Sequence, residues 1–177
     1  MLDPADCGPA CISLSQDVQG EVFEYPEDFF KERVHVIRRP KPDDYQIKEA
    51  AELIKKSKKP LIISGGGVFY SDATDELSSF ATKHNIPVTQ TVMGYSTMKK
   101  DHSHYLGAIG GLGGRAANNL SKETDMAIAI GTKLADFTTG SWANFENPNF
   151  KLVSINAARF DANKHMAQAV VGDAKVS

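Results

Sequence analysis

The chain has 177 residues, which is enough for one domain with a sizeable core, or for one domain with parts of its neighbours. Its hydrophobic fraction of 41% and charged fraction of 24% are ordinary for a soluble globular protein. The formal net charge of −2 gives no reason to expect nucleic acid or an anionic membrane as a partner. No apolar stretch approaches the length of a bilayer span and no signal peptide opens the chain, so we expect a cytoplasmic protein.

The start of the chain carries little periodicity. The apolar run Cys11–Leu14 predicts a short strand, and Val34–Ile37 predicts another. A single strand cannot bury itself, so the first should pair with a neighbour outside this chain. Residues 20–42 contain three prolines and mixed charges, which indicates a linker that wraps over a surface. Cys7 and Cys11 lack further Cys or His residues at metal-ligand spacing, and we interpret them as ordinary thiols in a reducing compartment.

A regular pattern begins at Asp43. This residue is a predicted helix N-cap, with Gln46 as its capping-box partner. The helix that follows carries one buried face at the i, i+3, i+4, i+7 positions Ile47, Ala50, Ala51 and Ile54. We interpret the lysines within residues 55–59 as the C-terminal end of that helix, where positive charge is favourable, and not as a nucleic-acid-binding patch.

Beyond this helix, short apolar strands alternate with helical segments. Strands are predicted at Leu61–Ser64, Val88–Thr91, Met126–Ile130, Leu152–Ile155 and Ala169–Val171. One helix is predicted to start at Ser71 or Asp72, and another to span Ala116–Leu120. Strands without a polar face are typical of a parallel sheet that is covered on both sides. We therefore predict an α/β fold with a doubly wound parallel sheet and helices on both faces.

Glycine is concentrated in the middle of the chain: ten of fourteen glycines lie between Gly65 and Gly131. The first cluster, Gly65–Gly67, follows an apolar strand and precedes a helix, a context in which backbone N–H groups can hold phosphates. The dinucleotide fingerprint is incomplete, because Tyr70 stands where it requires a third glycine.

Ligands bind to doubly wound sheets at the carboxyl ends of the strands. The candidate nucleotide site at those ends consists of Gly65, Gly66, Gly67, Gly131, Thr132 and Asn156. No Ser/His/Asp or Cys/His arrangement is legible there, so we predict no catalytic residue and no metal site in this chain. We interpret His102 and His104 as residues that order their loop, and not as metal ligands, because no third ligand lies near them in the sequence. Lys133 and Asp136 either meet a nucleotide or pair with each other.

Taken in order, these motifs resemble the middle domain of thiamine-diphosphate-dependent enzymes such as acetohydroxyacid synthase and pyruvate oxidase. The matching pieces are Gly8-Pro9, Leu14, Gln16-Asp17-Val18, Lys59-Pro60-Leu61, Gly65-Gly66-Gly67, Ile86-Pro87-Val88, Leu106-Gly107, Gly110, Gly113, Asp125, Ile130-Gly131, Val153-Ser154-Ile155-Asn156 and Gly172-Asp173-Ala174. Within the family, the segments 3–9, 136–141 and 159–165 resemble the branch that opens the ring of a cyclic 1,2-dione in myo-inositol catabolism.

The resemblance implies a domain order and a set of missing parts. Residues 1–18 would end a preceding pyrimidine-binding domain, 19–42 would be a linker, and 43–177 would form a Rossmann-like middle domain. Thiamine diphosphate and Mg²⁺ would be held by N- and C-terminal domains that this chain lacks, in a longer protein that forms homo-oligomers. The chain alone would be inactive.

Three roles remain open at this stage. The resemblance leaves an acetolactate-synthase-like parent as an alternative. A second alternative is a stand-alone nucleotide-binding module, similar to NAD-dependent deacetylases. A third role, a purely structural spacer between catalytic domains, is compatible with a hydrolase parent. The relatives that bind flavin carry an acidic residue at the position of Asn156, and a neutral amide accepts hydrogen bonds from ribose more weakly. We therefore expect no tightly bound FAD or other cofactor in this fragment.

Overall fold

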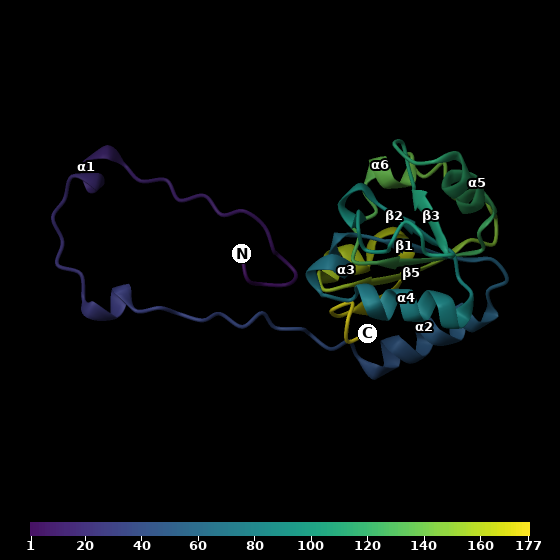
Figure 1. Ribbon diagram of the computed structural model, residues 1–177, viewed down its shortest axis with the longest axis horizontal. Helices are drawn as coiled ribbons and strands as arrows, with labels where there is room; N and C mark the ends of the chain where they lie inside the picture. The colour runs from purple at the N-terminus through teal and green to yellow at the C-terminus, as the bar shows by residue number, and fades with distance from the viewer.

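Six parallel strands form one sheet, in the order β3-β2-β1-β4-β5-β6, with helices on both faces (Figure 1). The computed structural model describes residues 1–177. The strands are β1 Pro60–Ser64, β2 Val88–Gln90, β3 Tyr105–Ala108, β4 Met126–Ile130, β5 Lys151–Asn156 and β6 Gln168–Val171. The predicted doubly wound α/β fold is confirmed.

The helices divide between the two faces of this sheet. They are α1 Gln16–Gln19, α2 Asp44–Lys56, α3 Gly66–Tyr70, α4 Thr74–His84, α5 Arg115–Glu123, α6 Asp136–Thr139 and α7 Arg159–Ala162, with 3-10 turns η1 Glu27–Phe30, η2 Val92–Gly94 and η3 Lys164–Met166. Helices α2 and α4 lie together below the sheet, and α5 and α6 lie above it (Figure 1). None of the helices is long and apolar enough to cross a membrane.

Each central strand contributes to two hydrophobic cores. Ile62 and Ile128 belong to the core that contains Ala50 of α2 and Leu77 of α4. Their neighbour Ile63, together with Ala127 and Ala129 of β4, belongs to the core on the opposite face. Successive side chains of a strand point to opposite faces, so a strand covered on both sides needs an unbroken apolar run.

Helix α2 begins at the predicted position, but the prediction of a capping box is wrong. The Asp43 carboxylate accepts a hydrogen bond from the Tyr45 amide at 2.8 Å. Gln46 does not turn back to the cap; its Oε1 accepts from the amide of Val171 on β6 at 2.9 Å. Strand β6 is an edge of the sheet, and an unpaired amide there would lose a hydrogen bond. Gln46 therefore bonds to strand β6 and not to the start of its own helix.

Strand β3 was not predicted from the sequence. It forms the other edge of the sheet, it is only half-buried, and it contains Gly107 at a φ of +89°. Its register with β2 is irregular. An edge strand with a glycine has neither the apolar run nor the alternation by which strands are recognised.

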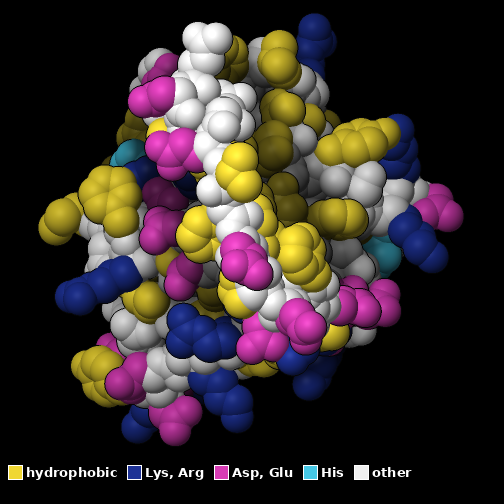
Figure 2. All heavy atoms as spheres, turned by 90° about the vertical axis from the view of Figure 1, so that its left-hand side faces the viewer, with side chains coloured by type: hydrophobic (Ala, Val, Ile, Leu, Met, Phe, Trp, Pro, Cys, Tyr) yellow, Lys and Arg dark blue, Asp and Glu magenta, His cyan; other side chains and the backbone are white.

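Residues 1–37 form an open loop whose ends, at Met1–Pro4 and Ile37, lie beside the body and whose middle extends away from it (Figure 1). The strand predicted at Val34–Ile37 is wrong, because this segment is exposed and pairs with nothing. Cys11–Leu14 is also exposed and unpaired, and its predicted partner lies outside this chain, so that strand stays a prediction. Phe23, Tyr25 and the two phenylalanines of η1 form a small exposed aromatic cluster. Figure 2 views the molecule from the side of this loop and shows hydrophobic and acidic side chains intermixed there.

Candidate functional site

The carboxyl ends of β1, β4 and β5 meet at one edge of the sheet, and the predicted site residues come together there. The Gly65 amide donates to the Ile130 carbonyl at 2.8 Å, and the Gly67 amide donates to the Gly131 carbonyl at the same distance. In turn the Gly131 amide donates to Ile155 at 2.8 Å. The turn after β1 is thus bonded directly to the end of β4, and two of its amides are already engaged.

The glycines of this turn are required for a close approach of two backbones. A Cβ on Gly65 would lie 2.3 Å from the Gly131 carbonyl oxygen, and one on Gly67 would lie 2.5 Å from the Gly131 Cα. Gly131 itself has a φ of +60°, which non-glycine residues adopt rarely. Backbone packing therefore accounts for these three glycines, without a ligand.

Asn156 and Thr132 hold the loops beyond the strands. Asn156 Nδ2 donates to the Thr132 carbonyl at 3.1 Å, and its Oδ1 accepts from the Ala158 amide at 2.9 Å. The Thr132 hydroxyl accepts from the Leu134 amide at 3.2 Å. Each polar atom of the Asn156 side chain makes one hydrogen bond within the protein, which leaves one lone pair of Oδ1 and one hydrogen of Nδ2 for a ribose.

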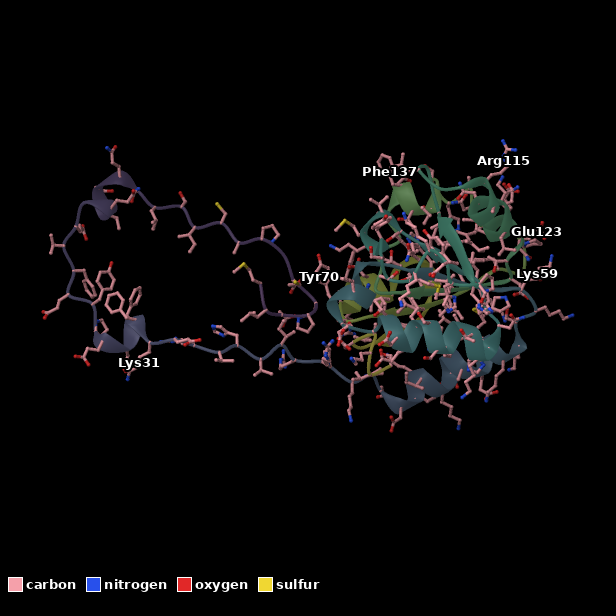
Figure 3. All side chains as sticks on the ribbon, in the orientation of Figure 1. Lys31, Lys59, Tyr70, Arg115, Glu123 and Phe137 are labelled. Atoms are coloured by element: carbon pink, nitrogen blue, oxygen red, sulfur yellow. The ribbon has the colours of Figure 1, made fainter.

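A hollow of about 120 Å³ lies beside these residues. Gly67, Gly131 and Asn156 line one side of it, and Met1 and Leu2 line the other. Tyr70 lies on the side of the body that faces the N-terminal loop (Figure 3). Small-molecule pockets are commonly about 300–1,000 Å³, so this hollow can enclose only part of a nucleotide.

An ion pair that the sequence analysis did not identify lies next to this hollow. Asp173 is buried, and its carboxylate accepts from Arg39 Nη1 at 3.1 Å. Arg39 also donates to the Ser71 carbonyl. The contact joins the end of the linker to the turn after β6. Two residues so far apart in the sequence give no local signal of their pairing.

The remaining candidates are ordering contacts. His104 Nε2 lies 2.9 Å from Asn85 Oδ1, and His102 Nε2 lies 3.3 Å from the Thr82 hydroxyl, so both rings attach their loop to the end of α4. No group of three or more His, Cys, Asp and Glu side chains is placed to hold a metal ion. Lys133 and Asp136 are exposed and form no ion pair with each other.

The opposite edge of the sheet contains a second polar cluster. Burial alone would raise the pKa of Asp125, but hydrogen bonds from the Ser57 hydroxyl and the amides of Lys58 and Lys59 outweigh it and hold this pKa below its ordinary value. Lys59 pairs with Glu123 at 2.9 Å, and the two lie together at this edge (Figure 3). The cluster fastens the start of β1 to the start of β4.

Comparison with known proteins gives consistent matches. The sequence profile described as "Thiamine pyrophosphate enzyme, central domain" matches residues 47–177. The chain is 49% identical over 175 residues to a 3D-(3,5/4)-trihydroxycyclohexane-1,2-dione hydrolase of Clostridium botulinum, and 46% identical over 177 residues to one of Bacillus subtilis. These alignments cover 99% and 100% of this chain but only 27% and 28% of the relatives, so the chain spans little more than a quarter of their length.

A solved structure shares the fold. An X-ray structure of a protein assigned as a thiamin diphosphate-dependent enzyme from Mycobacterium smegmatis aligns with a TM-score of 0.63 at 20% identity. The alignment covers 82% of this chain and 28% of that one. At this identity the likeness concerns the arrangement of strands and helices.

Proposed function

The chain belongs to the family of thiamine pyrophosphate enzyme central domains, and we propose that it is the central domain of a hydrolase that opens the ring of a cyclic 1,2-dione. The observation that carries the proposal is the 46–49% identity, over the whole chain, to relatives named as trihydroxycyclohexane-1,2-dione hydrolases. An acetolactate-synthase-like parent is less well supported, since those relatives carry the name of the hydrolase.

In this proposal, thiamine diphosphate would supply the chemistry of carbon–carbon bond cleavage in the longer protein. The residues of this chain do not fit its metal–diphosphate group, because no acidic or histidine cluster is present to hold Mg²⁺. In the longer protein, other domains would hold the cofactor and its Mg²⁺. This domain would serve as a rigid spacer between them.

The proposal has further parts, which the resemblance of the chain to this family implies. Residues 1–18 would belong to a preceding domain and 19–42 to the linker, with the central domain beginning at residue 43. The longer protein would act in myo-inositol catabolism, in the cytoplasm and as a homo-oligomer. Two observations agree with this arrangement: residues 1–37 are exposed outside the sheet domain, and both cysteines are free.

The experiment compares this chain with the full-length protein, each supplied with thiamine diphosphate and Mg²⁺ and with trihydroxycyclohexane-1,2-dione. We expect ring opening by the full-length protein and none by residues 1–177. A matched reaction with pyruvate separates the two parents, because an acetolactate-synthase-like enzyme would consume it. Turnover of the dione by this chain alone would overturn the spacer role. Turnover of pyruvate in place of the dione by the full-length protein would overturn the proposed substrate.

A weak nucleotide site at the carboxyl edge is a secondary proposal, supported by the convergence of Gly67, Gly131 and Asn156 on one hollow. Its small volume and its engaged amides favour ADP-like fragments at low affinity over stoichiometric FAD. Titration with ADP and FAD tests this. We expect Asn156→Asp to bind ADP more tightly, because a carboxylate is a stronger acceptor for ribose hydroxyls, and to lower stability, because an oxygen then replaces the Nδ2 donor to the Thr132 carbonyl.

The control for that titration is Asn119→Asp, an exposed position on α5 away from the hollow. It should leave ADP binding unchanged. A protein that purifies yellow, with one flavin per chain, would contradict the proposal.

A further inference from the structure

Two large apolar side chains lie exposed on neighbouring loops at the carboxyl edge of the sheet. Leu112 is 74% exposed in the loop after β3, and Phe137 is 73% exposed on α6, which follows β4. Phe137 points away from the body of the domain (Figure 3). Neither side chain belongs to a hydrophobic core. Single exposed hydrophobic residues are common, so the backbone that carries these two is the informative feature.

The backbone beneath Leu112 and Phe137 is held closely. The Gly111 amide donates to the Phe137 carbonyl at 2.8 Å, which bonds the loop after β3 to α6. Gly110 has a φ of +98°, and a Cβ atom there would overlap the Phe137 carbonyl oxygen, so only glycine fits. The Gly113 amide donates back to the Gly110 carbonyl at 2.8 Å. Leu112 therefore lies in a tight turn whose position relative to Phe137 is fixed.

Asn118 of α5 clamps this turn through a single residue. Its Oδ1 accepts from the Gly110 amide at 2.9 Å, and its Nδ2 donates to the Gly110 carbonyl at 3.0 Å. The Nδ2 of the buried Asn144 lies 3.5 Å from both Asn118 Oδ1 and the Thr138 carbonyl, which extends the contact to α6. An asparagine that bonds both backbone groups of one residue fixes the orientation of that residue as well as its position.

The location of these two side chains suits contact with a substrate. Doubly wound sheets bind ligands beyond the carboxyl ends of their strands, with side chains on loops that a rigid scaffold positions. Phe137 lies in segment 136–141, one of the segments by which the sequence resembles the branch that opens the ring of a cyclic 1,2-dione. A side chain that is exposed, rigidly carried and part of such a segment is a candidate determinant of substrate choice.

We propose that Asn118 is a positioning residue that holds Leu112 and Phe137 against the ring of the dione in the longer protein. The inference rests on the hydrolase function proposed above, and it adds a substrate contact to the role of the domain as a spacer. The ring of a trihydroxycyclohexane-1,2-dione carries C–H groups, on which aromatic and aliphatic side chains pack without a charged partner. Pyruvate carries a carboxylate, for which two apolar side chains offer no partner.

The experiment uses the full-length protein with thiamine diphosphate and Mg²⁺, and it measures kcat and KM for trihydroxycyclohexane-1,2-dione. Phe137→Ala removes a ring that lies outside both cores, so the protein should fold, with KM raised about tenfold and kcat within about twofold of the unmodified value. Phe137→Leu keeps an apolar side chain and should restore most of the loss. Asn118→Ala should raise KM in the same way, although both apolar side chains are still present.

Two control variants match these changes. Asn119→Ala makes the same substitution at the exposed neighbour of Asn118 on α5. Tyr45→Ala removes an exposed aromatic ring from α2, which lies on the opposite face of the sheet from α6 (Figure 1). Both variants should leave KM and kcat for the dione unchanged.

Hydroxyl-radical labelling with mass spectrometry observes the same contact without turnover. Phe137 and Leu112 are exposed in residues 1–177 and should be labelled readily there. In the full-length protein, the dione should lower the labelling of Phe137 at least about twofold, because a bound ligand buries most of the surface that it contacts. The labelling of Tyr45 should not change when the dione is added.

Two results would overturn the inference while the proposed function stands. KM for the dione could be unchanged in both Phe137→Ala and Asn118→Ala. Phe137 could be fully protected from labelling before the dione is added, which would assign it to a contact between domains. Failure of the proposed function is distinct, because the unmodified full-length protein would then not open the dione. In that case, protection of Phe137 by the dione would still support the contact with the ring, and unchanged labelling would overturn it.

Discussion

At the scale of single residues, the contact between Gly65 and Gly131 decides how the carboxyl edge is built. The two backbones approach so closely that neither position has room for a Cβ atom. The amides of Gly65 and Gly67 are bonded across this contact. The glycine turn therefore joins two strands, and its resemblance to a phosphate-binding turn comes from the same need for small residues.

We predict that Gly65→Ala lowers the free energy of unfolding by about 3 kcal/mol, since the added methyl group would overlap the Gly131 carbonyl and force the two strands apart. Urea unfolding at neutral pH measures the change. Gly111→Ala is the control, because a Cβ there meets only ordinary contacts, and it should change stability by less than about 0.5 kcal/mol. Equal effects of the two substitutions would contradict the packing role.

At the scale of elements, the amino edge of the sheet depends on one carboxylate. Asp125 accepts from the Ser57 hydroxyl and from two successive backbone amides, which fastens the loop before β1 to the start of β4. These bonds lower the pKa of Asp125 in the folded protein despite its partial burial. A carboxylate with a lowered folded pKa stabilises the protein above its unfolded pKa, and this contribution is lost as pH falls through the folded value.

We predict that Asp125→Asn destabilises the domain by about 1–3 kcal/mol at pH 7, and that its difference from the unmodified chain narrows as pH is lowered below about 4. Urea unfolding across this pH range provides the test. The control is Asp72→Asn: the pKa of Asp72 is lowered by the Lys175 ammonium, but this carboxylate is exposed and its pair contributes little. If the difference in free energy of unfolding between Asp125→Asn and the unmodified chain is constant with pH, the ionised carboxylate is not the source of the stabilisation.

At the scale of the whole molecule, residues 1–37 and the sheet domain differ in how they are held. The domain contains both hydrophobic cores, while no residue among the first thirty-seven is buried. The exposed ion pair between Asp3 and Arg38 spans 3.6 Å and adds little. Stability of the chain should therefore come almost entirely from residues 38–177.

We predict that removal of residues 2–37 changes the free energy of unfolding by less than about 1 kcal/mol. In the intact monomer, amides of Cys11–Leu14 should exchange with solvent far faster than those of Leu61–Ser64. Hydrogen exchange with mass spectrometry compares the two segments in one sample. Equal protection of both segments would show that the N-terminal loop is part of the folded unit.

The parallel sheet could be predicted from the sequence, because buried strands such as Ile62–Ser64 and Met126–Ile130 need apolar residues on both faces. The sequence also indicated where α2 begins, since an N-cap acts within one turn. It indicated the family through ordered short motifs, and the profile match over residues 47–177 confirms that resemblance.

The hydrogen-bond partners of several polar groups could be known only from the folded structure. Gln46 bonds to β6 in place of its own helix end, Arg39 meets Asp173, and the edge strand β3 forms without an apolar run. The folded structure also shows that the glycine amides are engaged across the sheet. The physical reason is range: helix caps and strand patterns act between near neighbours, whereas these hydrogen bonds join residues that only the completed fold brings within reach.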